Sequence, residues 1–496
     1  MASDIPSFQP YILTPLDHLV PPFHALFYLS FQPEHPSEAV AALQTGISHL
    51  VSQWPFLAGN VARVQKGDKR NILELQPPSA SDLLRYPILQ VKHHQQSISH
   101  AMSLPVINGE LLHIPTKVPI SYPVPAVRFQ ANLMQDGVVL CLGWHHQVMD
   151  AVGVSTLLVS LSRCCHGLDR KAAIPRRLPT DIKREERARR QIEEATTPNK
   201  ADWEGAYHRS GCEEVWSGYS EPLICRRYAM QTDKVSYLKY SCNNLVQDRV
   251  RSSLKTRGNL SDGITEYLDE NDHLSSDDVA TALTWLCASR ARRRAVSRYS
   301  SDLPRMSSLT RLVEARSILQ PPLPRSYLGN SLVSARAQCD WEEIPVKQKG
   351  SCVAGKRGQV DEETINTLLE LALRSRAKCR SIDDEHIRGL IDCMKNCDDY
   401  MSFSIAPAVV EMSSLRKLDI FAWDWGSKIG PLVDFDTIDS RTDGLSLILP
   451  ANSAKPGQSP WEIRITLPLA AMEAFEKDEL LGWATGTGKP SVQAMM

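Results

Sequence analysis

The chain lacks an excess of charge of either sign. Its 496 residues include 56 Lys and Arg against 57 Asp and Glu, for a formal net charge of −1 at pH 7. A surface that holds a nucleic acid or another polyanion normally carries a clear basic excess. We therefore expect no nucleic-acid partner, although a local basic patch for the phosphates of a small ligand is compatible with this composition.

Long apolar runs are missing as well. Runs such as Gly137 to Trp144 are far shorter than the roughly 18 residues that cross a bilayer. Met1 to Pro10 has neither a basic start nor an uninterrupted apolar core, so we expect no signal peptide. These absences predict a cytoplasmic protein without a membrane partner, and we expect it to act as a monomer.

The cysteines form no recognisable framework. There are 12 of them, and they are scattered along the chain. Cys164 and Cys165 are adjacent, and Cys393 and Cys397 lie one helical turn apart, but neither pair has the spacing of a zinc site or of a small disulfide-bonded domain. We expect reduced thiols, no metal site and no permanently bound cofactor.

Segments with strand and helix patterns alternate in both halves of the chain, which predicts an α/β fold. In the first half, Ser37 is expected to cap a helix that ends near Gln53, and the continuous apolar run Val138 to Trp144 is typical of a buried strand. In the second half, we expect a strand over Tyr228 to Lys234 and a helix that opens at Ser275.

A Pro-rich and then highly charged stretch separates the two halves. Residues 175–203 are dense in Arg, Lys and Glu, and we interpret them as a solvated connector that is helical in part. The sequence therefore predicts an N-terminal lobe over residues 1–175, a charged crossover linker over 176–227 and a C-terminal lobe over 228–496.

The most informative residues follow the apolar strand directly. His145 and His146 end the strand, and Asp150 follows the second histidine at i+4, just before a helical pattern. A strand end holds a side chain rigidly at the mouth of a cleft. An imidazole there is neutral at pH 7 and can accept a proton, as acyl transfer from a thioester to an alcohol requires.

Other interpretations of these residues stay open from the pattern alone. Asp150 can orient His146, as in a catalytic triad, or face away and hold the loop through an ion pair. The histidines can also be plain strand-end residues, with Asp150 serving only as a helix cap. A metal site is disfavoured because adjacent side chains on a strand point to opposite faces.

Further motifs in the same order give the chain a family resemblance. They are Leu13-Thr14-Pro15-Leu16-Asp17, Pro55-Phe56-Leu57-Ala58-Gly59, His145-His146-Gln147-Val148-Met149-Asp150, Glu314-Ala315-Arg316 with Tyr327-Leu328-Gly329-Asn330, and Asp424-Trp425-Gly426. In this order the chain resembles the BAHD acyltransferases over nearly its whole length, and especially their fungal branch, which includes trichothecene O-acetyltransferases.

The resemblance implies a two-lobe chloramphenicol-acetyltransferase-like fold, with a mixed sheet flanked by helices in each lobe. It places His146 in a channel between the lobes as the general base, without a covalent intermediate. It implies that acyl-CoA, most often acetyl-CoA, is the donor, and that a hydroxyl or amine of a small specialised metabolite is the acceptor. It also pairs Asp150 with Arg316, which gives both residues a structural role.

The chain departs from the family pattern at several positions. Ala151 stands where a glycine usually follows the aspartate, and the next glycine is Gly153. The Asp424-Trp425-Gly426 element continues with Ser427-Lys428 and is incomplete, and we expect a turn remote from the chemistry there. Leu415 stands where a side chain that helps to stabilise the oxyanion is found, so Ser413 or a backbone amide is the expected donor.

For coenzyme A, the candidates are Ser275 and Ser276 at a helix start, which are equally good plain helix caps, and Lys428. The Gly-rich stretch from Gly482 to Lys489 is not a phosphate loop, because its spacing is wrong and Pro490 replaces the required Ser or Thr. Two rival functions stay open: a free-standing condensation enzyme that takes its acyl group from a carrier protein, and a catalytically inactive binding relative.

Overall fold

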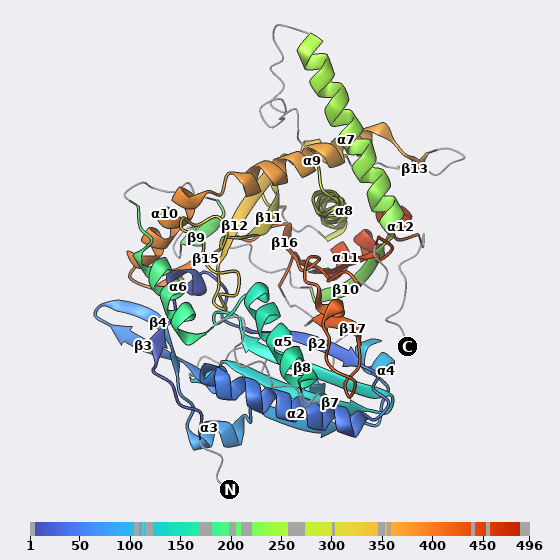
Figure 1. The fold of residues 1–496 in the computed structure, drawn as a ribbon. Helices are drawn as coiled ribbons and strands as arrows, with labels where there is room; N and C mark the ends of the chain where they lie inside the picture. The colour runs from blue at the N-terminus through green and yellow to red at the C-terminus, as the bar shows by residue number, and fades with distance from the viewer. Residues whose placement is uncertain are drawn as a thin grey trace.

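The computed structural model describes residues 5–103, 109–111, 114, 123–167, 181–197, 205–209, 221–255, 273–299, 303–345, 353–354, 359–437, 442–452 and 457–486. Two larger sheets dominate these residues, one in the lower part of Figure 1 and one in the upper part. Within the described residues, no helix is both long enough and apolar enough to span a membrane.

The lower sheet has five strands in the order β17-β2-β8-β7-β5. The strands are β2 (His24–Phe31), β5 (Leu89–His93), β7 (Val127–Met134), β8 (Gly137–His145) and β17 (Leu432–Thr437). All neighbours are antiparallel except β5 and β7. The central strand β8 is buried along its whole length, as its continuous apolar sequence predicts.

Helices α2 (Pro36–Gln53) and α5 (Ala151–His166) pack against each other and contribute to the core of this lobe. The expected cap at Ser37 is wrong by two residues. Pro36 occupies the first turn of α2, and His35 is the N-cap and makes no side-chain capping bond. A proline suits this position because its missing N–H has no partner within the helix there.

A four-stranded sheet and shorter helices complete the first half of the chain. The strands β1 (Tyr11–Ile12), β4 (Lys69–Gln76), β3 (Asn60–Lys66) and β6 (Val124–Pro125) are antiparallel and lie in that order. The helices are α1 (Pro15–His18), α3 (Ala80–Arg85) and α4 (Ile98–Ser103), with 3-10 turns at Pro55–Ala58 and Gly109–Leu111.

The upper sheet has six strands in the order β10-β19-β18-β16-β11-β12. The strands are β10 (Leu223–Met230), β11 (Ser307–Glu314), β12 (Leu332–Cys339), β16 (Val410–Ser414), β18 (Leu445–Ile448) and β19 (Trp461–Pro468). Strand β16 runs parallel to both of its neighbours, and the other pairs are antiparallel, so the sheet is mixed.

Helices cover one face of the six-stranded sheet. They are α7 (Thr232–Lys255), α8 (Ser276–Tyr299), α9 (Glu362–Arg380), α10 (Asp384–Lys395), α11 (Leu469–Glu476) and α12 (Glu479–Thr485). Small elements complete the described chain: β9 (Tyr207–Arg209) with β15 (Phe403–Ile405), β13 (Val353–Ala354) with β14 (Gln359–Val360), and 3-10 turns at Trp341–Glu343, Tyr400–Ser402 and Ile420–Ala422.

Two expectations for the second half need correction. Strand β10 ends at Met230 and α7 begins at Thr232, so the expected strand over Tyr228 to Lys234 is wrong beyond its first residues. In the Gly-rich stretch, Gly482 to Thr485 belong to α12, and Gly486 ends that helix in the left-handed conformation. Residues 487–490 lie outside the described residues.

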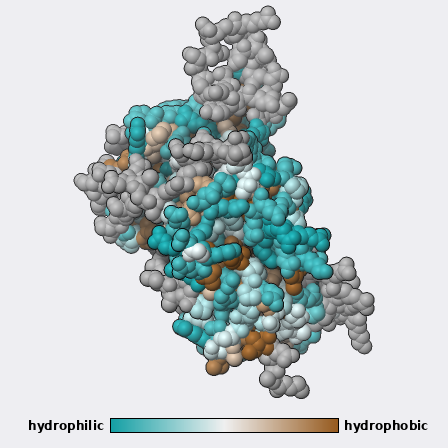
Figure 2. Space-filling model, turned by 90° about the vertical axis from the view of Figure 1, so that its left-hand side faces the viewer, coloured by the Kyte–Doolittle hydropathy of each residue, from teal (hydrophilic) through white to brown (hydrophobic). Residues whose placement is uncertain are grey.

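The second half of the chain contributes a strand and core residues to the lower lobe. Strand β17 comes from the second half, yet it pairs antiparallel with β2 at the edge of the five-stranded sheet. The core cluster of the lower lobe also contains Leu328, Leu415 and Leu449 from the second half. On the face drawn in Figure 2, hydrophobic residues form small separate patches among mostly hydrophilic ones.

Candidate active site

The turn after β8 is fixed by backbone contacts on both sides. His145 pairs with His24 across β2, and the N–H of His146 donates to the carbonyl of Phe23 at 2.8 Å. The indole N–H of Trp144 donates to the carbonyl of Met149 at 2.9 Å and closes the turn. The position of His146 is therefore set by two adjacent strands of the sheet.

The His146 ring is surrounded by protein but keeps partial solvent exposure. Its centroid lies 5.0 Å from that of Phe23 and 6.4 Å from that of the Trp144 ring. Burial lowers the pKa of His146 from 6.5 to about 4, and its own backbone carbonyl and Asp150 oppose this shift only in part. The imidazole is therefore neutral at neutral pH and able to accept a proton.

His145 differs from its neighbour. It is fully buried and packs edge-on against His24, with ring centroids 5.7 Å apart. Burial holds the pKa of His145 well below its usual value. Within the described residues, no group of three or more His, Cys, Asp or Glu side chains is arranged to hold a metal ion.

Asp150 and Arg316 form a buried ion pair. Two guanidinium nitrogens of Arg316 each donate to a carboxylate oxygen of Asp150 at 2.9 Å, and both side chains are almost fully buried. Asp150 is also the N-cap of α5 and accepts from the N–H of Gly153 at 2.9 Å. The contact that the family resemblance implies is present, and the carboxylate is occupied by these donors.

The departure at Ala151 leaves the turn unstrained. Asp150 has extended backbone angles and Ala151 is the first residue of α5, so no residue with positive φ is needed there. Glycine is needed two residues later instead. A Cβ at position 153 would overlap the backbone carbonyl of Leu328, so Gly153 allows the segment around Leu328 to approach α5 closely.

That segment, the turn Tyr327–Ser331 from the second half of the chain, docks directly beneath the His146 turn. The side-chain amide of Asn330 donates to the carbonyl of His146 at 3.0 Å and to Asp17 Oδ1 at 3.0 Å. The N–H of Ser331 donates to Asp150 at 3.0 Å. Carboxylates from two distant parts of the chain therefore hold this turn against the histidine.

Asp17 belongs to α1 and is buried. It accepts from the backbone N–H of Asn330 at 2.8 Å and from the N–H of Thr14 at 2.7 Å. Burial raises the pKa of Asp17 to about 6, although these hydrogen bonds oppose the rise. The Leu-Thr-Pro-Leu-Asp motif thus forms a capped helical turn that supports the Asn330 contact.

The charged connector contributes to the same region, which the sequence did not indicate. Helix α6 (Ile182–Glu194) is not simply solvated: Glu185 is buried and accepts from the N–H of Leu328 at 3.1 Å. Arg189 stacks over the Tyr11 ring at 3.8 Å. The expectation of a solvated connector therefore holds for α6 only in part, because one face of the helix is exposed and the other bridges β1 and the Tyr327–Ser331 turn.

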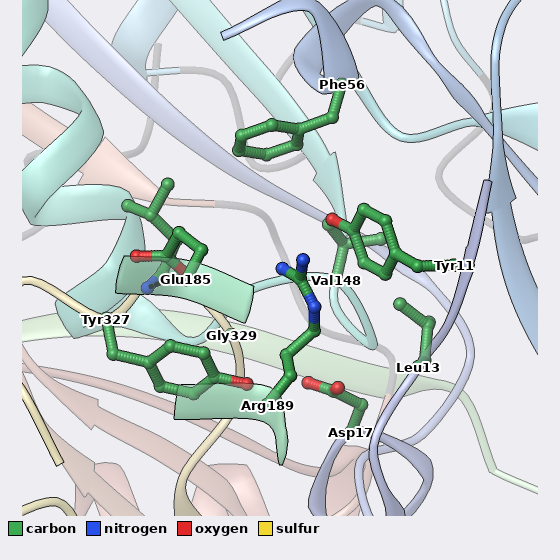
Figure 3. Close-up of a pocket in the computed structure, with 10 residues that line it drawn as sticks. Tyr11, Leu13, Asp17, Phe56, Val148, Glu185, Arg189, Tyr327 and Gly329 are labelled. Carbon is green, nitrogen blue, oxygen red and sulfur yellow. Dashed lines mark hydrogen bonds between the residues drawn. The ribbon is translucent and has the colours of Figure 1, made fainter. Parts of the chain in front are cut away.

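Figure 3 shows a small, narrow pocket among these residues. Tyr11, Glu185, Arg189 and Tyr327 contribute polar groups to its wall. Val148 also lines it, but His146 does not. The hydroxyl of Tyr327 is buried and has no hydrogen-bond partner in the described part of the chain. This pocket adjoins the support of the histidine turn and is separate from the imidazole itself.

The other predicted site residues are dispersed over the second half. Ser413 is partly exposed in β16 and makes no hydrogen bond to His146, and Leu415 is buried in the core cluster that contains Trp144. Trp425 packs on Phe31, with ring centroids 5.1 Å apart, just before a turn that begins at Gly426. This aromatic contact fits the expectation of a structural turn.

The coenzyme A candidates are likewise not brought together by any contact. Ser275 caps α8 in a reciprocal arrangement with Asp278: its hydroxyl donates to the carboxylate at 2.7 Å and accepts from the Asp278 N–H at 3.2 Å. Ser276 is the first residue of α8. Lys428 is exposed shortly before β17.

Comparison with known proteins gives consistent matches. A model of the Transferase family matches residues 111–481, and a model of the trichothecene 3-O-acetyltransferase-like N-terminal domain matches residues 24–165. The communesin N16 acyltransferase of Penicillium expansum is 30% identical over 496 residues, which cover 96% of this chain and 98% of the relative. The fumigaclavine B O-acetyltransferase of Aspergillus fumigatus is also 30% identical, with coverage of 96% and 98%.

Solved structures show the same fold. The crystal structure of F. sporotrichioides TRI101 complexed with coenzyme A and T-2 matches with a TM-score of 0.70 and 18% identity, covering 95% of this chain and 98% of that one. Vinorine synthase matches with a TM-score of 0.61 and 15% identity, covering 97% and 95%. The predicted two-lobe fold is confirmed, and the chain belongs to the Transferase family and is an acyltransferase of the BAHD type.

Proposed function

We propose that this enzyme transfers an acyl group, preferably acetyl, from acyl-CoA to a hydroxyl or amine of a small specialised metabolite, with His146 as the general base. Relatives across nearly the full length are named as O-acetyltransferases, and one is named as an N16 acyltransferase. Related structures with the same fold contain coenzyme A. Both facts support a thioester donor and a small acceptor.

The observation that carries the proposal is the environment of His146. His146 is partly exposed, and its imidazole is neutral. The residue is held at the end of a rigid strand, because its backbone N–H donates to the carbonyl of Phe23 and its carbonyl accepts from the side-chain amide of Asn330. A base that is held in place and unprotonated at neutral pH is what proton removal from an alcohol requires. Asp150 is already committed to Arg316, so we assign both residues a structural role.

The reaction follows from this placement. Nε2 of His146 accepts the proton of the acceptor hydroxyl as its oxygen attacks the thioester carbonyl carbon. The tetrahedral intermediate collapses when the carbon–sulfur bond breaks, and the imidazolium returns the proton to the sulfur of coenzyme A. The thioester supplies its own leaving group, so no covalent enzyme intermediate is needed.

Stabilisation of the oxyanion is assigned to Ser413 or to a backbone N–H near it. Leu415 is apolar and buried, so it cannot donate a hydrogen bond. Removal of one oxyanion donor typically lowers kcat by about 10²–10³-fold. We therefore expect a Ser413→Ala change to lower kcat with little effect on KM for the acceptor.

For the donor, we propose that Ser276 and Lys428 contact coenzyme A, and that Ser275 at the capped start of α8 does so as well. The capping bonds of Ser275 to Asp278 occupy its hydroxyl, so any contact from this residue would use its backbone. We further propose that the enzyme acts in the cytoplasm as a monomer.

We also propose a division of the chain into an N-terminal lobe over residues 1–175, a linker over 176–227 and a C-terminal lobe over 228–496. The five-stranded and six-stranded sheets support this division, with β17 as a segment of the last part that completes the first sheet.

The test is acyl transfer by the purified enzyme, with acetyl-CoA and a panel of hydroxylated and amine-bearing metabolites. The His146→Ala variant should fold normally and lose about 10²–10⁴-fold in rate. His166→Ala is the matched control, because His166 lies on the same lobe and pairs with the exposed Asp424. A rate of His146→Ala within a few fold of the wild type would exclude the proposed mechanism.

A second arm tests the rival donor. An acetyl group on a phosphopantetheine carrier domain is offered in place of acetyl-CoA. Turnover from the carrier alone would favour the condensation enzyme, and no thioester turnover with any acceptor would favour an inactive binding relative.

A further inference from the structure

Strand β16 presents two different faces. Val410 and Met412 belong to the core cluster that α8 and α9 contribute to, and the hydroxyl of Ser414 donates to Asp277 of α8 at 2.6 Å. Successive side chains of a strand point to opposite faces. Glu411 and Ser413 therefore lie on the face of the six-stranded sheet that is turned away from these helices.

That face is directed toward the lobe that carries His146. Ser413 pairs with Leu447 of β18, and Leu447 packs against the core cluster that contains Trp144 and Met149. Leu415, two residues beyond Ser413, belongs to the same cluster. Glu411 lies two residues before Ser413 on the same face, about 6–7 Å along the strand. Its side chain therefore lies on the face of the sheet that is turned toward the lower lobe.

Glu411 is a carboxyl without a partner. It has no hydrogen bond or ion pair to any described residue, although it is surrounded by protein and only partly exposed. Burial alone raises the pKa of Glu411 to about 7. A carboxyl in such a place is costly for the protein unless a ligand or solvent satisfies it.

The neighbouring strand adds a second unsatisfied polar group. Thr310 of β11 lies directly beside Glu411 in the parallel register, and neighbouring strands are about 4.8 Å apart. Its hydroxyl is fully buried and has no hydrogen-bond partner in the described residues. A carboxyl and a hydroxyl thus stand side by side on the inter-lobe face, and neither has a hydrogen-bond partner among the described residues.

The cations nearest in the register are committed elsewhere. Arg311 points to the opposite face and pairs with Asp277 at 2.6 Å. Arg336, across β12 from Thr310, donates to the carbonyls of Ala406 and Pro407. Neither residue neutralises Glu411, so a cation that pairs with its carboxylate would come from a bound molecule.

We propose that Glu411, assisted by the hydroxyl of Thr310, binds the protonated amine of a basic acceptor and so orients the acceptor in the space between the two sheets. The inference rests on the proposed function, since it names the class of acceptor: an alcohol or amine that also carries a basic nitrogen. The donor is not a suitable occupant, because coenzyme A offers no cation: its pantetheine arm is uncharged and its phosphates are anionic.

The experiment measures charge preference with matched probes. Rigid amino alcohols are each paired with the neutral alcohol in which carbon replaces nitrogen, with quinuclidinol and its carbocyclic counterpart bicyclo-octanol as the smallest pair. Kd is measured by calorimetric titration, and kcat/KM by acetyl transfer from acetyl-CoA. The wild type should favour the cationic member by about 10- to 100-fold, as for a charge-assisted hydrogen bond.

The Glu411→Gln variant should bring this preference to within about twofold, and Thr310→Val should reduce it in part. Glu342→Gln is the matched control: it removes the same charge from an exposed position and should retain the wild-type preference. The proposal is overturned if the wild type shows no preference for the cation, or if the preference survives in Glu411→Gln.

The same probes separate this inference from the proposed function. His146→Ala should lose acetyl transfer but keep the charge preference in Kd. Loss of transfer in His146→Ala with no charge preference in the wild type would overturn the role of Glu411 alone. Retained transfer in His146→Ala would overturn the catalytic assignment, while the binding result still decides the role of Glu411.

Discussion

The side-chain amide of Asn330 donates to the backbone carbonyl of His146 at 3.0 Å, although the two residues lie in different halves of the chain. The same amide group donates to Asp17. The carbonyl of His146 also opposes, in part, the lowering of the pKa of its own imidazole by burial. A contact that fixes this carbonyl therefore helps to hold the backbone of the histidine turn in place.

We predict that Asn330→Ala lowers kcat by about tenfold to a hundredfold, because small displacements of a catalytic group have effects of this size. KM for acetyl-CoA should change less than kcat, since Asn330 touches the histidine turn rather than the donor candidates. Steady-state kinetics, with circular dichroism as a check on folding, measures both. Asn366→Ala on the remote helix α9 is the control, and equal losses in the two variants would contradict a positioning role.

Asp150→Asn should damage folding more than chemistry. The carboxylate and Arg316 form a buried bidentate pair, and loss of one partner of such a pair costs on the order of 3–5 kcal/mol in the free energy of unfolding. Urea denaturation of the variant measures this loss. Turnover per folded molecule should fall much less than in His146→Ala.

The control for this prediction is Arg70→Ala. Arg70 is 68% exposed and lies 3.5 Å from Asp399, and exposed pairs of this kind contribute about 0–1 kcal/mol. Wild-type stability together with abolished turnover in Asp150→Asn would instead assign Asp150 a catalytic role.

The sequence predicts the parts of the site that are local. The continuous apolar run predicts β8, the doubled histidine at its end marks the residue that we propose as the base, and the ordered motifs predict the fold and the Asp150–Arg316 pair. These features depend on side chains a few residues apart or on motifs that recur as a set.

Contacts between distant segments are not visible in the same way. The pairing of β17 with β2 and the bond from Asn330 to His146 join residues far apart in the chain, and no periodicity reports them. Glu185 lies in a run of charged residues that is typical of a solvated segment. Its burial depends on the turn at Leu328, which is distant in the sequence. Glu411 lies in a short strand, and only the sheet register gives it a neighbour in Thr310.

Gly153→Ala should destabilise the protein by about 1–3 kcal/mol, as for other overpacked sites. The new methyl group would meet the carbonyl of Leu328, which is backbone and is held by the neighbouring turn. Chemical denaturation measures the change. The matched control is Gly46→Ala in α2, where the methyl group would meet the Sγ atom of Cys165, a side chain.

Both substitutions gain helix propensity, by up to about 1 kcal/mol in a helix interior, so an opposite result at Gly153 reports the contact with Leu328. Gly46→Ala should be the milder change. If Gly153→Ala proved as stable as the wild type, the close approach of the Tyr327–Ser331 turn to α5 would be contradicted.

The pH dependence of catalysis should reflect the burial of His146. Burial lowers the pKa of His146 from 6.5 to about 4, so the base stays unprotonated as the pH falls through 6.5 and is lost only near pH 4. With a neutral alcohol as acceptor, kcat/KM should stay nearly level through pH 6.5, and its acid limb from this group should lie near pH 4.

At His146 the folded protein also binds fewer protons than the unfolded chain, so the free energy of unfolding falls as the pH drops from about 6.5 through 4. Unfolding must therefore be followed in parallel by fluorescence. Burial raises the pKa of Asp17 to about 6, and the Asp17→Asn variant separates that titration from the one at His146. An acid limb centred at or above pH 6.5 in both proteins would show that the imidazole is not desolvated in the working enzyme.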